Sequence, residues 1–314
     1  MHSLFSGFVP IWVLTAAGYL VGRAGLLGEQ AEAVLGRFVF HVAMPASLFA
    51  MLERSPLGAF GNSSMIAFAA GTALTSLLGA LAARRLFGRG PADQAIAAMA
   101  AGYVNSANLG IPVAVQVLGD ASFIVPVLLF QVLLVSPAVL AVLDSATATS
   151  GGGARTALRR MVLLPVRNPI IMAAALGCLA SATGFRLPGE LDHSCQVLGG
   201  AAVPTALVTL GLSLHGRRPA TGTNGRAEVG LQVVLKTLVQ PLVAYAVGAL
   251  LLGLPPHQLL AVVICSALPT AQNVYIYAQQ YRLDTALARD SVLISTLVSM
   301  ATLSGIAWAL GGRG

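Results

Sequence analysis

The sequence predicts an all-α integral membrane protein with ten transmembrane helices. Of its 314 residues, 56% are hydrophobic and only 9% are charged, and the mean hydropathy is +0.82. A water-soluble domain needs a larger share of charged residues to cover its surface. Apolar runs of about 20 residues, the length that crosses a bilayer, recur along the whole chain. The composition therefore excludes the soluble classes of protein, and the lipid bilayer is the first partner that we expect.

Apolar runs separated by charged or Gly/Pro-rich segments define the expected spans. In chain order they are 4–22, 33–52, 63–83, 94–118, 121–143, 168–184, 194–214, 229–252, 257–281 and 290–310. The first run is expected to be a retained span rather than a signal peptide, because Arg23 follows the apolar stretch instead of preceding it. The longest polar interruption, 144–167, divides the chain into five-helix halves at 1–143 and 168–314.

The basic residues test this count of spans. The net charge is +7, and most of the arginines fall in the loops after odd-numbered spans, with few on the opposite side. Basic residues mark cytoplasmic loops. This alternation predicts that both termini lie outside and that 144–167 is a cytoplasmic linker. It also accounts for the net charge without a nucleic-acid partner.

The two halves share residues at a nearly constant offset. The matched residues of the first half are Pro10, Ile11, Gly18, Leu20, Gly25 and Pro45, and those of the second half are Pro169, Ile170, Gly177, Leu179, Gly184 and Pro204, each 159 positions later. Pro112 and Pro269 form a further pair, at an offset of 157. Because each half has an odd number of spans, the second half must enter the bilayer from the opposite face. The sequence therefore predicts two inverted repeats, an architecture of secondary transporters.

Matching interruptions in spans 4 and 9 predict the transport site. Both 105–112 and 268–273 are polar, lie near mid-span and contain a proline, which lacks a backbone donor and clashes with a continuing helix. A simple proline kink is the alternative, but two kinks at repeat-related positions favour broken, crossing helices. The predicted substrate-binding residues are Asn105, Ser106, Asn108, Gly110, Pro112, Pro269, Thr270, Gln272, Asn273 and Lys236.

The charges within the spans indicate the type of substrate. No acidic residue lies in the middle of a span, whereas cation exchangers generally hold their ion with a buried carboxylate. Half-helix N-termini attract anions, so the substrate is expected to be a small organic anion. Lys236 either attracts that anion or extends to the membrane interface. His41 is either an interior histidine or a proton-coupling group, and it is the candidate for coupling.

Three motifs resemble the auxin efflux carrier family. They are Asn-x-x-x-x-Gly-Ile-Pro at 105–112, Ala-Leu-Pro-Thr-Ala-x-Asn at 267–273 followed by Ala278 and Tyr281, and Arg-Asn-Pro-Ile-Ile at 167–171. The family includes plant auxin exporters and bacterial permeases for malate or malonate. The resemblance implies a fold like that of bile-acid symporters and sodium/proton antiporters, with a scaffold domain and a transport domain. It further implies elevator-like carboxylate transport, with Asn105 and a Pro112–Pro269 crossover at the site.

The family pattern also narrows the expected substrate and location. The central loop is short, as in the bacterial members, which implies a multi-pass protein of the bacterial inner membrane. Val274 stands where plant sequences carry another proline. A small metabolite anion is therefore a better expectation than auxin.

The leading hypothesis is a carrier of a mono- or dicarboxylate driven by a proton or by the membrane potential. The alternative in the same class is a sodium-coupled, bile-acid-like organic anion symporter. A membrane sensor or intramembrane enzyme is a third hypothesis, but the sequence has no HExxH, GxSxG or paired intramembrane aspartates, and no soluble signalling domain. We expect no enzymatic activity, no metal and no cofactor. A homodimer is left open.

Overall fold

The computed structural model describes residues 2–54, 63–118, 123–147, 169–215 and 223–311, and over these ranges the chain forms helices joined by short turns and by extended residues that include one isolated β-bridge. The first half contains α1 (His2–Arg23), α2 (Ala31–Phe38), η1 (Val39–Ala43), α3 (Met44–Arg54), α4 (Ser63–Arg85), α5 (Pro91–Gly102), η3 (Ser106–Gly110), α6 (Ile111–Leu118), α7 (Ile124–Phe130), η4 (Gln131–Val135) and α8 (Ser136–Thr147). The second half contains α10 (Pro169–Thr183), α11 (Gly189–Gly200), α12 (Ala202–Leu212), α13 (Thr223–Val234), η5 (Leu235–Val239), α14 (Gln240–Ala246), η6 (Val247–Leu251), α15 (Pro256–Ala267), α16 (Asn273–Gln280) and α17 (Thr285–Gly311). The η segments are wide π-helical turns between helices. The all-α class is confirmed for these residues.

Six continuous helical segments are long and apolar enough to cross a membrane. They are Ala31–Arg54, Ser63–Arg85, Pro126–Thr147, Gly189–Leu212, Gly225–Leu251 and Thr285–Leu310. The protein is therefore a multi-pass membrane protein. The count of ten spans and the inverted repeat stay predictions. Most of the expected linker, 148–167, lies outside the described residues.

The boundary of the last span differs from the prediction. We placed Arg289 in the loop before a span that begins at residue 290, but α17 begins at Thr285 and Arg289 is 2% exposed. Its Nη1 atom donates a 3.1 Å hydrogen bond to the carbonyl oxygen of Ser213, just beyond the end of α12. A cation at this position is stabilised by the negative end of the helix, which offsets the cost of burying the guanidinium.

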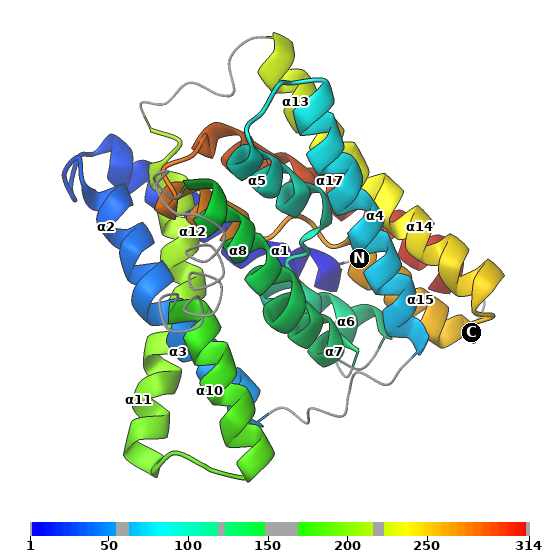
Figure 1. The fold of residues 1–314 in the computed structure, drawn as a ribbon, viewed down its shortest axis with the longest axis horizontal. Helices are drawn as coiled ribbons and strands as arrows, with labels where there is room; N and C mark the ends of the chain where they lie inside the picture. The colour runs from blue at the N-terminus through cyan, green and yellow to red at the C-terminus, as the bar shows by residue number, and fades with distance from the viewer. Residues whose placement is uncertain (1, 55–62, 119–122, 148–168, 216–222, 312–314) are drawn as a thin grey trace, which may run out of the picture.

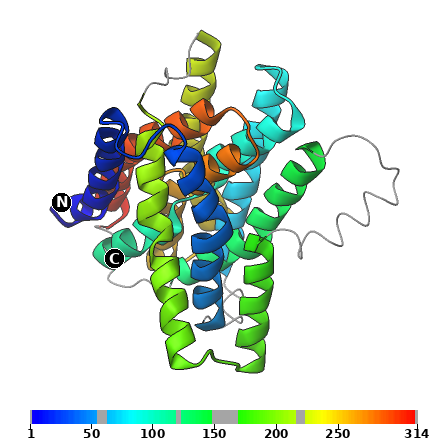
Figure 2. The same ribbon diagram turned by 90° about the vertical axis from the view of Figure 1, so that its left-hand side faces the viewer.

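The helices form two packed groups. In one, α1 packs on α12, and α3 packs on α10 and α11. In Figure 1, α3, α10 and α11 project from one end of the molecule, away from α13, and Figure 2 shows the same three helices side by side. In the other, α4 packs on α5 and α14, α5 on α8, and α17 on α13, α15 and α16. We call these the flanking group (α1, α2, α3, α10, α11 and α12) and the crossing group (α4 to α8 and α13 to α17).

Candidate functional site

Two interrupted helices cross in the middle of the crossing group. α5 ends at Gly102 and α15 ends at Ala267, and Val104 and Thr270 then form an antiparallel β-bridge. Leu268 is extended because it precedes Pro269, which disfavours the helical conformation of the residue before it. The amide of Asn105 donates to the carbonyl of Pro269 over 2.8 Å, and the amide of Ala271 donates to that of Tyr103 over 3.1 Å. The two breaks therefore satisfy each other's backbone groups, as a low-dielectric interior requires.

The crossing point corrects one sequence expectation. Pro269 lies in the break, but Pro112 is the second residue of α6, beyond the break in its own segment. The preceding turn, η3, is wide, and the amides of Leu109 and Gly110 both donate to the carbonyl of Asn105. A wide turn accommodates a proline that cannot donate its own hydrogen bond. The crossing is therefore centred on Val104 and Thr270 with Pro269 beside them, and Pro112 is not part of it.

Several predicted ligands instead hold the crossing together. The Thr270 hydroxyl donates to the carbonyl of Ala100 over 2.7 Å, and the Ser106 hydroxyl donates to Gln131 Oε1 over 3.3 Å. Gln131 in turn donates to the carbonyl of Val104 over 2.9 Å. Asn105, Ser106, Thr270 and Gln131 are each at most 4% exposed. The side chains of Ser106, Gln131 and Thr270 therefore help to fix the geometry of the unwound segments.

Gly110 is a packing position, since a Cβ there would lie 3.0 Å from Ile124 and 3.3 Å from Leu268. The side chains of Asn108 and Pro112 lie outside the described residues.

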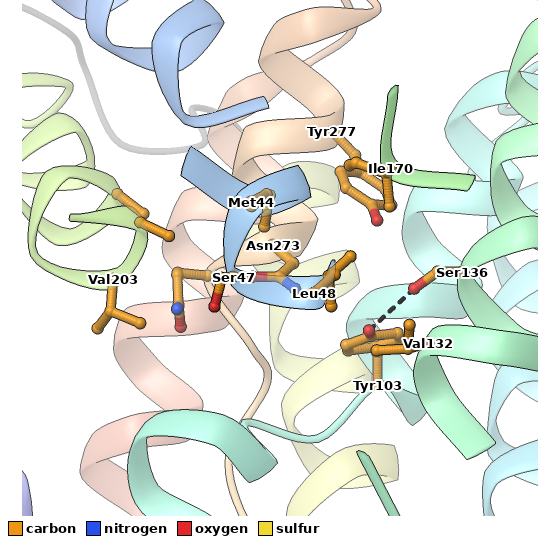
Figure 3. A pocket seen from close by; sticks show the side chains of 13 residues that line it. Met44, Ser47, Leu48, Tyr103, Val132, Ser136, Ile170, Val203, Asn273 and Tyr277 are labelled. Carbon is orange, nitrogen blue, oxygen red and sulfur yellow. Dashed lines mark hydrogen bonds between the residues drawn. The ribbon is translucent and has the colours of Figure 1, made fainter. Parts of the chain in front are cut away.

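A small cleft, partly open to solvent, lies beside the crossing and between the two groups of helices (Figure 3). Its lining consists of Met44, Ser47, Leu48, Tyr103, Val132, Ser136, Ile170, Ala202, Val203, Ala206, Gln272, Asn273 and Tyr277. Gln272 and Asn273 are the predicted site residues that the structure brings to this cleft. Met44, Ser47 and Leu48 come from α3 of the flanking group, opposite Tyr103 and Asn273 of the crossing group.

The polar groups of the cleft form one uncharged cluster. The Tyr103 hydroxyl and Ser136 Oγ are 2.9 Å apart, and Figure 3 shows this hydrogen bond. Asn273 also interacts with Tyr103, and Tyr277 with Ser136. The Oε1 atom of Gln272 is buried without a hydrogen-bond partner. No charged side chain occurs among the described residues that line the cleft.

The cleft also receives the positive end of a helix. α16 begins at Asn273, so its first turn lies at the cleft. Unpaired amides at a helix N-terminus favour anions. Hydroxyl and amide donors beside this end can bind a small anion without a fixed positive charge. Ser47, Tyr103, Ser136 and Tyr277 were missing from the predicted site, although Tyr277 follows Asn273 by one helical turn, a spacing that places both on one face.

His41 and Lys236 occupy different environments. His41 is exposed, its Nδ1 atom is 3.1 Å from the carbonyl oxygen of Arg37, and its ring meets Phe40 edge-on. It is not an interior histidine and it does not line the cleft. Lys236 is fully buried, and its Nζ atom is 2.6 Å from Gln240 Oε1 and 2.8 Å from the carbonyl oxygen of Ser266. The expectation that it extends to the membrane interface is wrong. It lies against the crossing but does not line the cleft.

The structure brings together no group of three His, Cys, Asp or Glu residues that could hold a metal within the ranges it describes.

Comparison with known proteins gives one family over nearly the whole chain. The family described as membrane transport protein matches residues 3–307. A protein of Rhizobium meliloti named "Putative malonate transporter" is 27% identical, over 96% of this chain and 94% of its own. An uncharacterized transporter of Methanothermobacter thermautotrophicus is 28% identical, over 94% of both chains. Auxin efflux carrier component 3a of Oryza sativa is 24% identical, over 51% of this chain and 28% of its own.

Proposed function

The chain belongs to the membrane transport protein family, the auxin efflux carrier family whose motifs it resembles, and from this we propose that it is a secondary carrier of a small organic anion. The substrate class is a mono- or dicarboxylate. The observation that carries this proposal is the uncharged cleft at the N-terminus of α16, beside the crossing of two broken helices. The similarity to a relative named for malonate agrees with this class.

The chemistry of the cleft suits reversible binding of a carboxylate. The hydroxyls of Tyr103 and Tyr277 and the amide of Asn273 can donate to carboxylate oxygens, while α16 supplies the positive end of a helix. Neutral donors in a low-dielectric site bind an anion with useful strength. The absence of a lysine or arginine among the described lining residues favours release on the other side, since a carrier must not hold its substrate too tightly.

The place of the cleft between the two groups of helices supports an elevator-like movement. One wall belongs to the flanking group and the other to the crossing group, which carries Tyr103, Asn273 and the crossing itself. Sliding the crossing group along the flanking group would carry these residues from one membrane face toward the other. In this assignment the flanking group is the scaffold and the crossing group is the transport domain.

Turn geometry supports an inverted repeat. Gly25 and Gly184, the glycines that end the first helix of each half, both have a positive φ, of 66° and 69°. Gly88 and Gly253 also have positive φ, of 63° and 58°. In the turns at Gly88 and Gly253, the amide of the next residue donates to the carbonyl six residues before it, Arg89 to Ala83 and Leu254 to Gly248. A residue other than glycine would be strained at such positions.

Interhelical packing supports the repeat independently. A Cβ at Gly18 of α1 would collide with the carbonyl of Val208 in α12. A Cβ at Gly177 of α10 would lie 3.1 Å from the carbonyl oxygen of Phe49 in α3. The predicted offset of 159 relates Gly18 to Gly177 and Phe49 to Val208. Two contacts exchanged by one offset are what a pseudo-two-fold axis produces.

The remaining assignments are part of the same proposal. The two five-helix repeats are 1–143 and 168–314, ten spans cross the inner membrane, and both termini lie outside. Carboxylate flux is driven by a proton or by the membrane potential.

The test is uptake of radiolabelled carboxylates, including malonate, by proteoliposomes that contain the purified protein. We expect saturable uptake of at least one carboxylate, and a fall of about tenfold in kcat/KM in Asn273→Ala, because one to two hydrogen bonds to the anion are lost. Gln30→Ala, which removes an exposed amide between α1 and α2, serves as the matched control and should transport like the wild type. Equal uptake by Asn273→Ala and wild type would remove the cleft from the transport path.

A further inference from the structure

The carbonyl ends of two half-helices meet at the crossing. α5 ends at Gly102 and α15 ends at Ala267, next to the paired breaks. The last carbonyls of a helix have no partner within the helix, and together they carry about half a negative charge. In secondary transporters, half-helix C-terminal ends and unwound carbonyls are where coupling cations bind. A cation at this place is therefore the physical expectation.

One ammonium and one amide reach both ends here. Lys236 Nζ donates to the carbonyl of Ser266, in the last turn of α15, over 2.8 Å. It also donates to Gln240 Oε1 over 2.6 Å. Gln240 Nε2 in turn donates to the carbonyl of Gly102, the last residue of α5, over 3.1 Å, and to the hydroxyl of Thr72 over 3.0 Å. The pair thus connects the two carbonyl ends from the side of η5 and α14.

Other carbonyls of the crossing also have protein donors. The Thr270 hydroxyl donates to the carbonyl of Ala100, and the Gln131 amide donates to the carbonyl of Val104. The backbone amides of Asn105 and Ala271 donate to the carbonyls of Pro269 and Tyr103. Lys236 is the one basic side chain among the described residues that reaches these carbonyls.

The ammonium has no acidic partner among the described ion pairs, which join Arg54 to Asp192, Arg89 to Glu228 and Asp284, and Arg289 to Asp290. Lys236 is 0% exposed, and a buried charge is costly unless neighbouring groups compensate it. The negative ends of α5 and α15 and the amide oxygen of Gln240 are the compensating groups. The helix ends therefore stabilise the cation, and the cation in turn holds the two helix ends together.

We propose that the ammonium of Lys236 is a fixed cation that fills the position between the two half-helix ends, so that removing it opens a site for a small monovalent cation. Lys236 is then a positioning residue for the crossing. For transport, the consequence is that the wild-type carrier takes up its anion without sodium from solution. The expectation of sodium-independent uptake rests on the proposed carrier function, whereas the proposal that Lys236 fills the position between the two helix ends does not.

The first experiment measures thermal unfolding of the purified protein in sodium chloride and in choline chloride at equal ionic strength. We expect the Tm of the wild type to be the same in both salts. In Lys236→Ala we expect a lower Tm in choline chloride and a rise of at least about 2 °C in sodium chloride, because sodium binds the vacated carbonyls of the folded state only. A purely structural role would lower the Tm of the variant equally in both salts.

Three variants sharpen the result. Lys236→Gln keeps a donor without the charge, and it should show the same sodium-specific rise if Lys236→Ala does not fold. Arg37→Met removes another basic residue from a membrane helix, at an exposed position, and should show no salt-specific change. Gln240→Ala keeps the ammonium and should remain insensitive to sodium. A sodium-specific rise in wild-type Tm, or none in either Lys236 variant, would overturn the proposal.

Uptake in the two salts provides the link to function. Wild-type carboxylate uptake that is equal in sodium and choline supports the fixed cation, and uptake that requires sodium overturns it. If no carboxylate is transported in either salt, the proposed substrate class fails, and the unfolding experiment still decides the role of Lys236.

Discussion

The hydroxyl of Tyr275 donates a 2.7 Å hydrogen bond to the carboxylate of Glu32, and this contact joins a half-helix of the crossing to the flanking group. Gln279, one turn further along α16, donates to the Glu32 carbonyl over 2.9 Å. Gly36 of α2 lies directly against the Gln279 side chain. In the proposed elevator movement α16 and α2 would move relative to each other, so these hydrogen bonds would break during a transport cycle.

Removing this contact should therefore change the distribution of conformations. Tyr275→Phe loses one charge-assisted hydrogen bond, worth about 1.5 kcal/mol or more, which only the present arrangement makes. The cleft is open to solvent here, so we expect slower thiol labelling of Ser47→Cys, by about tenfold, in a background without Cys178, Cys195 and Cys265. The matched control is Tyr281→Phe.

Tyr281 donates a 2.6 Å hydrogen bond to Asp144 within the crossing group. Tyr281→Phe therefore removes a similar tyrosine–carboxylate hydrogen bond, but one that does not join the crossing group to the flanking group. Equal effects of the two substitutions on labelling would show that the Tyr275 contact does not hold one conformation.

The Tyr103 hydroxyl should contribute to substrate binding more than to folding. Tyr103→Phe keeps the ring and the backbone hydrogen bond to Ala271 but loses the hydroxyl that meets Ser136 at the cleft. We expect KM for the transported carboxylate to rise by about three- to tenfold, with a change in Tm of only a few degrees. Uptake kinetics and thermal unfolding of the same preparation check this. An unchanged KM with a large fall in Tm would make Tyr103 a structural residue only.

The sequence predicted the two interruptions but not the crossing point. Prolines and amides in spans 4 and 9 indicated where the helices break. Val104, which pairs with Thr270, carries no local signal, because its extended conformation depends on a partner far away in the chain. The outward orientation of His41 was missed, although Arg37, one helical turn earlier on the same face, is a charged residue and is also exposed. For Lys236, the Gln240 partner four residues away is a readable pattern, but the Ser266 carbonyl is a tertiary contact.

Gly18 should tolerate no side chain. A Cβ at this position meets the backbone of Val208, which cannot rotate away as a side chain can. We therefore expect Gly18→Ala to force α1 and α12 apart and to lower the Tm by several degrees. Gly305→Ala in α17 is the matched control, because nothing lies within 4 Å of its added methyl group, and it should be neutral or slightly stabilising. Comparable losses of Tm would argue against close packing of α1 on α12.

Arg89 should be required for stability because its partner is buried. Its Nε and Nη2 atoms are 2.9 Å and 2.8 Å from Glu228 Oε2, and Glu228 is 1% exposed. The hydrogen bond to Glu228 raises the pKa of Arg89, so this contribution to stability is present below the ordinary pKa and is lost only at more alkaline pH. We expect no weakening of the pair between about pH 6 and pH 9.

Substitution separates this pair from an ordinary surface ion pair. Arg89→Met leaves a buried carboxylate unpaired and should cost about 3 kcal/mol, whereas Arg89→Met combined with Glu228→Leu should recover most of the Tm. A double variant no more stable than Arg89→Met would show that Glu228 has another essential contact.

Gln232 and Gln240 should respond in opposite directions to the same substitution. Both are 0% exposed, and with Lys236 they lie on one face at intervals of four residues. Gln240 satisfies the carbonyl of Gly102 and the ammonium of Lys236, so Gln240→Leu leaves both unpaired and should lower the Tm by several degrees. Neither polar atom of the Gln232 side chain has a hydrogen-bond partner. Gln232→Leu therefore removes the cost of a buried unsatisfied amide, about 1–3 kcal/mol, and should raise the Tm. Thermal unfolding of the two variants decides this, and a loss of stability in Gln232→Leu would mean that ordered water or an ion belongs beside Gln232 in the folded protein.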